Sequence, residues 1–310
     1  MAFELKVNEP VGAGITRNVK NQIERALRYL DAKAERAAKP AAGESQKDAI
    51  GEVRKCFKRV RAALRLAREE FGDDLYHEEN WCFRDAARPL TQVRDARVLV
   101  ETADRLRQQL VHAIGPGAYA KIRAALIANR QEVERVVLEQ GKAFAAVADS
   151  TTRARARLSE WKLQRDGWAA VEPGLRRTYR QGRRALALAT ESPSVASLHE
   201  WRKQTKYLWH QLQLLQAAWT DSEKEMVNRT HQLATLLGED HDLAVLRETL
   251  AADPLPYGGH HILKGVFAVI DQRRGELERQ AFALGQEIYK EPPTTFASRI
   301  EALMQYQEVA

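Results

Sequence analysis

Apolar and polar positions follow a helical period along nearly the whole chain after its first fourteen residues. Ala, Leu, Arg, Glu, Lys and Gln dominate these segments, and all six are strong helix formers. Runs of alternating β-branched residues between turn signals are missing, so the sequence predicts no sheet. We therefore expect an all-α fold, with helices at about 15–38, 47–70, 76–112 (broken near Pro89), 117–148, 153–166, 172–190, 194–218, 222–250, 260–290 and 294–307.

Proline and glycine separate the periodic segments and mark the predicted helix ends. These ends fall at Pro40 with Gly43, Gly115 to Gly117, Pro173 with Gly174, Pro193, Pro254 with Pro256, and Pro292 with Pro293. Because the helices are long and their connections short, we expect them to pack as antiparallel bundles.

One predicted helix carries a row of cations beside its apolar flank. At 100° per residue, the cations within about 40° of Arg54 are Lys58, Arg61, Arg65 and Arg68. The adjoining apolar arc contains Val53, Phe57, Val60, Leu64 and Phe71. From Arg54 to Arg68 there are seven cations and no acid, whereas a solvated helix face usually mixes both signs. Like charges one turn apart repel, so the row indicates an anionic ligand, with a plain solvated face as the alternative.

The same pattern returns in the second half of the chain. The segment GEVRKCFKRVR (51–61) aligns with HEWRKQTKYLW (199–209) at an offset of 148 residues. The segment LTQVRDARVL (90–99) aligns with LGEDHDLAVL (237–246) at an offset of 147. A weaker match pairs Arg17 and Lys20 with Arg177 and Arg180. Two matches in the same order at nearly one offset predict a duplicated helical unit.

The second copy repeats the placement of cations beside an apolar flank. With Arg202 as the origin, Lys206 and His199 lie at about +40° and +60°. The matching apolar arc contains Trp201, Leu208, Leu212 and Trp219. We expect an N-terminal tail over 1–14 and one domain over 15–310, with halves 15–150 and 151–310. Its two bundles should be related by a pseudo-two-fold axis, and both cation rows should line one cleft.

The composition narrows the choice of partner and setting. The 310 residues include 49 Lys and Arg against 42 Asp and Glu, and the net charge of +7 favours an anionic partner. No window approaches 18 consecutive apolar residues, and the first residues lack a signal-peptide pattern, so we expect no membrane span and no secretion. Cys56 and Cys82 form no CxxC motif, which favours a reducing, cytoplasmic setting without disulfides.

Taken together, the motifs resemble those of the CHAD domain, the conserved histidine α-helical domain. The likeness covers about 15–307 and rests on His199-x-x-Arg202-Lys203-x-x-Lys206, Arg54-Lys55-x-x-Lys58-Arg59-x-Arg61, Arg94-Asp95 with His241-Asp242, and, more weakly, YRQGRR at 179–184. The chain departs from the family pattern in three places. Gly51 stands where the first half would have a histidine, and Trp209 and His210 replace an Arg-Tyr pair.

The resemblance implies two pseudo-symmetric four-helix bundles around a basic central channel that binds inorganic polyphosphate. It also implies an accessory module, often beside triphosphate tunnel (CYTH) domains or associated with polyphosphate granules in the cytoplasm. The tunnel signature ExExK is absent here, so we expect a binding module without catalysis, cofactor or metal. The expected polyphosphate-binding residues are Arg17, Lys20, Arg54, Lys55, Lys58, Arg59, Arg61, Arg94, Arg177, Arg180, Arg184, His199, Arg202, Lys203, Lys206 and His241.

Two roles remain open for the Arg94-Asp95 and His241-Asp242 pairs. Either the two aspartates orient basic residues or cap a helix, or Arg94 and His241 themselves reach the ligand. If His199 takes part in binding, affinity should strengthen toward acid pH, because a bound phosphate favours the protonated imidazole.

Two other functions compete with polyphosphate binding. Nucleic-acid binding is the nearest alternative, since both ligands are polyanions. No helix-turn-helix, zinc-finger or RNA-recognition signature is present, and most of the six tryptophans fall on apolar arcs, so we expect no nucleic-acid partner. A phosphohydrolase is the other alternative, but neither GxxxxGK nor HExxH occurs in the chain.

Overall fold

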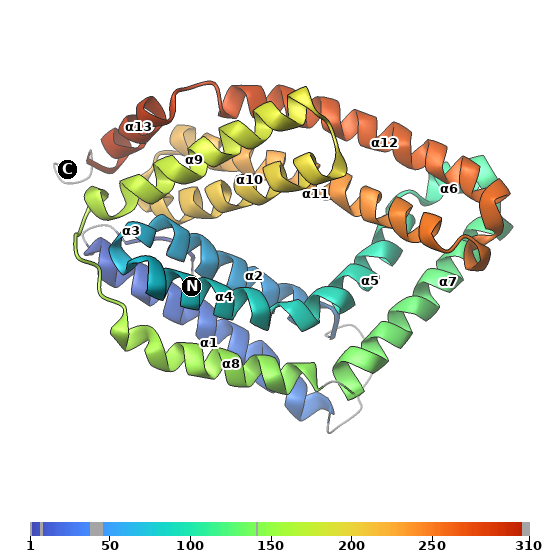
Figure 1. Cartoon of the computed structure of the whole chain (residues 1–310), viewed down its shortest axis with the longest axis horizontal. Helices are drawn as coiled ribbons and strands as arrows, with labels where there is room; N and C mark the ends of the chain where they lie inside the picture. The colour runs from blue at the N-terminus through green and yellow to red at the C-terminus, as the bar shows by residue number, and fades with distance from the viewer. Residues whose placement is uncertain (1, 7–8, 38–45, 141, 306–310) are drawn as a thin grey trace.

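The computed structural model describes residues 2–6, 9–37, 46–140 and 142–305, and within these ranges every regular element is a helix (Figure 1). The α-helices are α1 Val11–Ala37, α2 Gln46–Leu66, α3 Arg68–Phe71, α4 Asp73–Ala86, α5 Arg88–Arg105, α6 Arg107–Ile114, α7 Pro116–Glu134, α8 Ala143–Arg157, α9 Trp168–Glu191, α10 Val195–Leu215, α11 Asp221–Ala252, α12 Gly259–Ile288 and α13 Pro293–Gln305. A π-helical turn, Arg135–Gln140, follows α7. Short 3-10 turns lie at Leu158–Glu160, Gln216–Ala218 and Leu255–Tyr257. The predicted all-α class is confirmed for the described residues.

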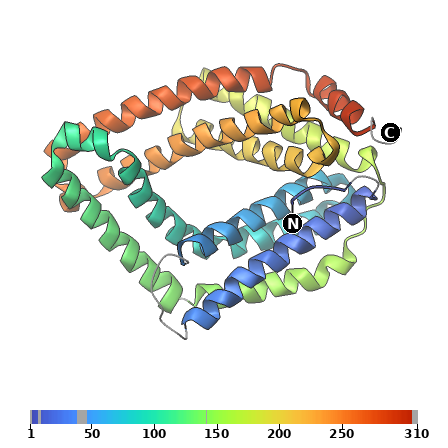
Figure 2. The same cartoon turned by 180° about the vertical axis from the view of Figure 1, so that it is seen from behind.

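The helices form two bundles that contact each other in two places, through α2 against α9 and α10 and through α5 and α6 against α11 and α12. Helices α1, α2, α4 and α8 pack together, and α10 packs between α9 and α11, with α12 and α13 against them. Helices α5, α6 and α7 belong to the first half of the sequence, yet α5 packs on α11, α6 on α12, and α7 on the turn Leu255–Tyr257 of the second half (Figures 1 and 2). The duplication and its pseudo-two-fold axis, with the domain limits drawn from them, stay predictions.

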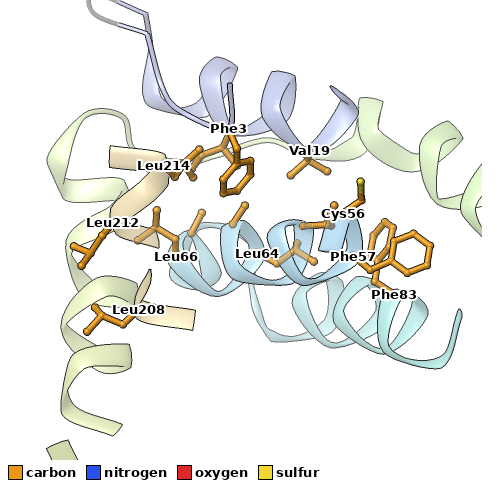
Figure 3. Close-up of a cluster of buried hydrophobic side chains, with 14 of the residues drawn as sticks. Phe3, Val19, Cys56, Phe57, Leu64, Leu66, Phe83, Leu208, Leu212 and Leu214 are labelled. Carbon is orange, nitrogen blue, oxygen red and sulfur yellow. The ribbon is translucent and has the colours of Figure 1, made fainter. Parts of the chain in front are cut away.

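The apolar arcs predicted for the two cation-bearing helices lie in the protein interior. In α2, Val53, Phe57, Val60 and Leu64 are fully buried. In α10, Trp201, Leu208 and Leu212 are fully buried as well. Figure 3 shows Phe57, Leu64 and Leu66 of α2 among side chains of α1, α4 and α10. Burial on one flank fixes the rotation of each helix, and thereby the direction of its cations.

A second, smaller core lies where α5 and α6 meet α11 and α12. It contains leucine, isoleucine, valine and tyrosine side chains from α5, α6, α7, α11 and α12, including Leu99, Leu126, Leu246 and Ile270. The larger core spans α1, α2, α4, α8, α9 and α10. The two cores bury different parts of the helices. The space between α2, α5, α10 and α11 therefore has an apolar core on each side of it.

Helix α9 runs through a predicted helix end. Pro173 lies inside it, so the end expected at Pro173 and Gly174 is wrong. A Cβ atom on Gly174 would lie 2.0 Å from the carbonyl oxygen of Leu66. Glycine is present here because the backbones of α9 and α2 touch, rather than because the helix stops.

The segments before α9 also differ from the prediction. The helix expected at 117–148 is interrupted by the π-helical turn and by Lys142, whose φ of 46° places it in the left-handed region. The helix expected at 153–166 is wrong beyond Arg157, since a 3-10 turn and a loop lead from there to Trp168. The end predicted at Pro40 and Gly43 lies outside the described residues.

The N-terminal residues pack against the second half of the chain. Helix α1 begins at Val11, four residues before the predicted start. Phe3 and Leu5 are buried in the larger core, and the Leu5 amide donates to the Leu214 carbonyl at 2.8 Å. Phe3 and Leu5 precede the helical periodicity on which the other predictions rest, so the sequence did not predict this packing. No helix in the described ranges is long and apolar enough to cross a membrane.

Candidate functional site

A cavity of about 560 Å³ lies between α2 and α5 on one side and α10 and α11 on the other. We call it the central cavity. Its cationic side chains are Arg54 and Lys58 of α2, Arg94 and Arg105 of α5, and Arg202 and Lys206 of α10. The acids in its wall are Asp95, Glu239 and Asp242, and the histidines are His199, His231 and His241. Six cations against three carboxylates leave the wall positively charged when the histidines are neutral.

The first two residues of the predicted α2 row and the predicted α10 row line this cavity, whereas Arg61, Arg65 and Arg68 do not. Arg54 and Lys58 stand one turn apart on α2, and Arg202 and Lys206 stand one turn apart on α10. Each pair lies beside the buried flank of its helix, and α2 packs against α10. A capping box at Ser194 fixes the start of α10, because the Ser194 hydroxyl accepts from the Ser197 amide at 3.1 Å.

The two lysines are held without a carboxylate partner. Among the described residues, neither Lys58 nor Lys206 has an oxygen of Asp or Glu within 4.0 Å. Burial, with added repulsion from Arg54 and Arg202, lowers the pKa of Lys58 from its ordinary 10.5 to about 7. Burial, Arg202 and Lys58 likewise lower the pKa of Lys206 well below its ordinary value. Both side chains remain partly exposed to the cavity, so a ligand can reach them.

The two arginines of these pairs, Arg54 and Arg202, differ in their hydrogen bonds. Arg54 donates to the hydroxyl of Thr91 and to the Ala87 carbonyl, the latter at 3.4 Å. The Nε of Arg202 is buried and has no hydrogen-bond partner in the structure. Burial lowers the pKa of both guanidinium groups, which still stay charged because arginine is so basic. A buried N–H without an acceptor is costly, so Arg202 has donor capacity available for a ligand.

Two histidines face each other at the wall of the central cavity. The Nδ1 atoms of His199 and His241 are 3.5 Å apart, and the ring centroids are 4.6 Å apart. Burial and the Arg202 charge lower the pKa of His241 to about 3, and the same two causes lower the pKa of His199. The pair is therefore neutral at pH 7, and either ring can donate one N–H while the other accepts.

Two of the three acids of the cavity lie beside arginines rather than lysines, Glu239 at 3.6 Å from Arg273 and Asp242 near Arg105. Asp242 lies 3.5 Å from Arg105, and Arg94 pairs with Glu101 at 3.2 Å. Burial raises the pKa of Asp95, although Arg54 and Arg94 oppose that effect. Asp242 thus orients a basic residue, which is one of the two roles considered for the aspartate of the His241-Asp242 pair. The basic residue is Arg105 of α5, not a neighbour in the same motif.

Several predicted site residues lie away from the central cavity, most of them beside other partners. Arg17 pairs with Glu9, Lys55 with Glu52, Lys203 with Glu200, and Arg177 with Glu69. The Arg59 guanidinium lies 5.3 Å from the ring centroid of Phe3. Arg180 lines a separate cavity with Arg176 and Arg177, Arg61 lines another, and Lys20 and Arg184 are exposed. The structure brings together seven of the sixteen: Arg54, Lys58, Arg94, His199, Arg202, Lys206 and His241.

The cavity also contains residues that the sequence motifs did not single out as ligands. Arg105 lies beyond the aligned segments, so no signal pointed to it. His231 stacks on Trp209 with ring centroids 4.1 Å apart and planes 14° apart. Gly51, the position that departs from the family histidine, lines the cavity, and a Cβ there would meet nothing within 4 Å.

Comparisons with known proteins agree with this architecture. A family model described as the CHAD domain matches residues 21–251. The crystal structure of the CHAD domain from the plant Ricinus communis is similar to this chain, with a TM-score of 0.53 and 16% identity. The match covers 98% of this chain and 95% of that one, and at such identity it shows the fold. A search among curated proteins finds no match. Since the family model spans well over half of the sequence, the chain belongs to the CHAD domain family.

Proposed function

We propose that the protein binds inorganic polyphosphate in the central cavity and acts there as a binding module without catalysis. The observation that carries this proposal is the meeting of Arg54, Lys58, Arg202 and Lys206, whose like charges face one space. Such an arrangement destabilises the empty protein, and a polyanion would relieve the repulsion. The CHAD family is commonly linked to polyphosphate binding, which favours this ligand among anions. Association with polyphosphate granules is a further expectation from the family.

The chemistry of the lining suits a chain of phosphates. Polyphosphate is a flexible line of charge without base edges or stacking surfaces, so its receptor needs many donors along one path. Arginine donates through a planar fork, and lysine supplies a mobile point charge. Cations on two facing helices can contact the chain from opposite sides. The buried Nε of Arg202 adds a donor that lacks any other acceptor.

The same lining is less suited to nucleic acid. Single strands bind through stacking of bases on aromatic rings as well as through charge. Among the described residues of the cavity wall, Trp209 is the one Trp, Tyr or Phe side chain, and its ring already lies against His231 and His210. A ligand of phosphates alone needs no such surface.

A competition assay tests the ligand. Long-chain polyphosphate should displace duplex and single-stranded DNA at equal phosphate concentration and fixed salt, in a mobility-shift or calorimetric measurement. Displacement in the opposite direction would reject polyphosphate as the preferred ligand.

A pair of charge reversals tests the site. Lys58→Glu with Lys206→Glu should strongly weaken polyphosphate binding. Lys121→Glu with Lys264→Glu is the matched control, because both residues are exposed and line none of the cavities described here. Equal affinity in the two variants would place the site on another face of the molecule.

A further inference from the structure

A second cavity, of about 540 Å³, continues the cationic surface beyond the central one. It lies between α2, α4 and α5. Arg54, Lys58 and Thr91 belong to the walls of both cavities. Past these shared residues, the second cavity is lined by Arg61 of α2, Arg84 of α4 and Arg88 of α5. We call this group of three arginines the α4–α5 subsite. The shared residues make the two cavities neighbours along one cation-lined path.

The second cavity has less negative charge than the central one. Five cations line it, and Asp85 is its one acid among the described residues. The Asp85 carboxylate already accepts from Arg84 at 2.9 and 3.0 Å. Arg88 makes no ion pair with the described residues. At the central cavity three acids accompany six cations, so the excess of positive charge is larger here.

The floor of the second cavity is apolar. Phe57 and Phe83 form it, both are buried, and their ring centroids are 5.6 Å apart. Arg61 is held above this floor, because its Nε donates to Asn80 at 3.0 Å and its guanidinium lies 5.9 Å from the Tyr207 ring. A concave, low-dielectric wall concentrates the field of the arginines in the cavity, which a flat solvated face would not do.

We propose that the α4–α5 subsite holds the continuation of a polyphosphate chain whose first part occupies the central cavity. The inference rests on the proposed function and adds a path for the ligand. A linear polyanion that leaves the central cavity past Arg54 and Lys58 meets the three further arginines without crossing an acidic surface. Short chains fill the central cavity alone, and long chains fill both, so the subsite makes the protein selective for length.

The variant Arg84→Ala with Arg88→Ala tests the subsite. Both side chains are exposed and alanine favours a helix, so the fold should persist, which circular dichroism checks. Each lost phosphate contact on a single chain lowers the slope of log affinity against log salt by about 0.7, and two contacts lower it by about 1.4. In 0.1 M salt, this corresponds to about 25-fold weaker binding of long-chain polyphosphate. Tripolyphosphate should bind as it does to the unaltered protein.

The control is Arg123→Ala with Arg153→Ala, which removes two ion-paired surface arginines outside both cavities. If the Arg84→Ala, Arg88→Ala variant binds long-chain polyphosphate with the same affinity and salt slope as the control, the α4–α5 subsite does not contact the ligand. If that variant loses as much affinity for tripolyphosphate as for long chains, the proposal that only long chains reach the second cavity is wrong. Absence of any polyphosphate binding by the unaltered protein would instead reject the proposed function itself.

Discussion

The positively charged side chains of the central cavity repel one another as long as no anion is bound. Lys58 and Lys206 lie near Arg54 and Arg202, and two of the three acids in the cavity wall lie beside other arginines. Charge that is held in place without a partner reduces stability, and functional sites are where proteins accept that loss. At the scale of the residue, the same charges therefore raise the affinity for a polyanion and lower the stability of the empty protein.

Replacement of the two lysines by methionine should separate these effects. Lys58→Met with Lys206→Met keeps the bulk of the side chains and removes their charge. The free energy of unfolding at pH 7 should rise by roughly 1 kcal/mol or more per lysine, since one pKa unit corresponds to about 1.4 kcal/mol. Polyphosphate affinity should fall in the same variant. Denaturant unfolding and calorimetry measure the two quantities.

The pH dependence provides the control for this variant. A lysine whose pKa is lowered in the folded state destabilises that state increasingly as pH falls from the ordinary pKa of 10.5 toward the lowered one, and the effect is constant below the lowered pKa. The advantage of the methionine variant should therefore shrink as pH rises from about 7 to 10.5. A stability difference that stays constant over this range would show that the lysine charges are not its cause.

Ligand binding should also take up protons. A bound phosphate favours the charged ammonium and raises the pKa of Lys58 from about 7. At about pH 8, polyphosphate binding should then draw protons from the buffer, and affinity should fall as pH rises further. Calorimetry in two buffers of different ionisation enthalpy measures the uptake. Uptake that is undiminished in the Lys58→Met, Lys206→Met variant would contradict this assignment.

At the scale of the helix, the sequence predicted what depends on local periodicity. The 3.6-residue repeat identified the buried flanks of α2 and α10, and hence the side on which Arg54, Lys58, Arg202 and Lys206 lie. The partners of the remaining cations depend on distant segments. Arg177 meets Glu69 across more than one hundred residues of sequence, which no helical periodicity encodes.

The contact between α9 and α2 shows the same limit. The sequence predicts a helix end at Pro173 and Gly174, because proline and glycine usually break helices. The tertiary structure uses Gly174 instead to bring α9 against the Leu66 carbonyl. That requirement arises from the approach of two helices that are far apart in sequence, so the local pattern could not distinguish it from a stop signal.

Gly174→Ala should therefore destabilise the protein, by about 1–3 kcal/mol or more, since the new methyl group meets backbone that cannot rotate away. Thermal or denaturant unfolding measures the loss. Gly275→Ala in α12 is the control, because its new Cβ would meet only the end of Arg279, at 3.7 Å. This control should gain about 0.5–1 kcal/mol from helix propensity. Similar stability of both variants would contradict the close contact.

At the scale of the whole molecule, the net charge of +7 says less than its arrangement. Two apolar cores hold α2 and α10 at one end and α5 and α11 at the other. The cations of both halves then face one cavity, while many surface arginines pair with acids. The sequence predicted one cleft for both rows, and Arg54 and Lys58 of the first row do line one cavity with the second row. It did not predict that α5 packs on α11 of the second half and completes the wall of that cavity.

The most direct test of the central claim is a crystal structure of the protein grown with tripolyphosphate. The account predicts phosphate density between α2 and α10, with oxygens about 3 Å from the side-chain nitrogens of Arg54, Lys58, Arg202 and Lys206. Phosphate bound only elsewhere, such as on the α9 arginines Arg176, Arg177 and Arg180, with none in the central cavity, would contradict it.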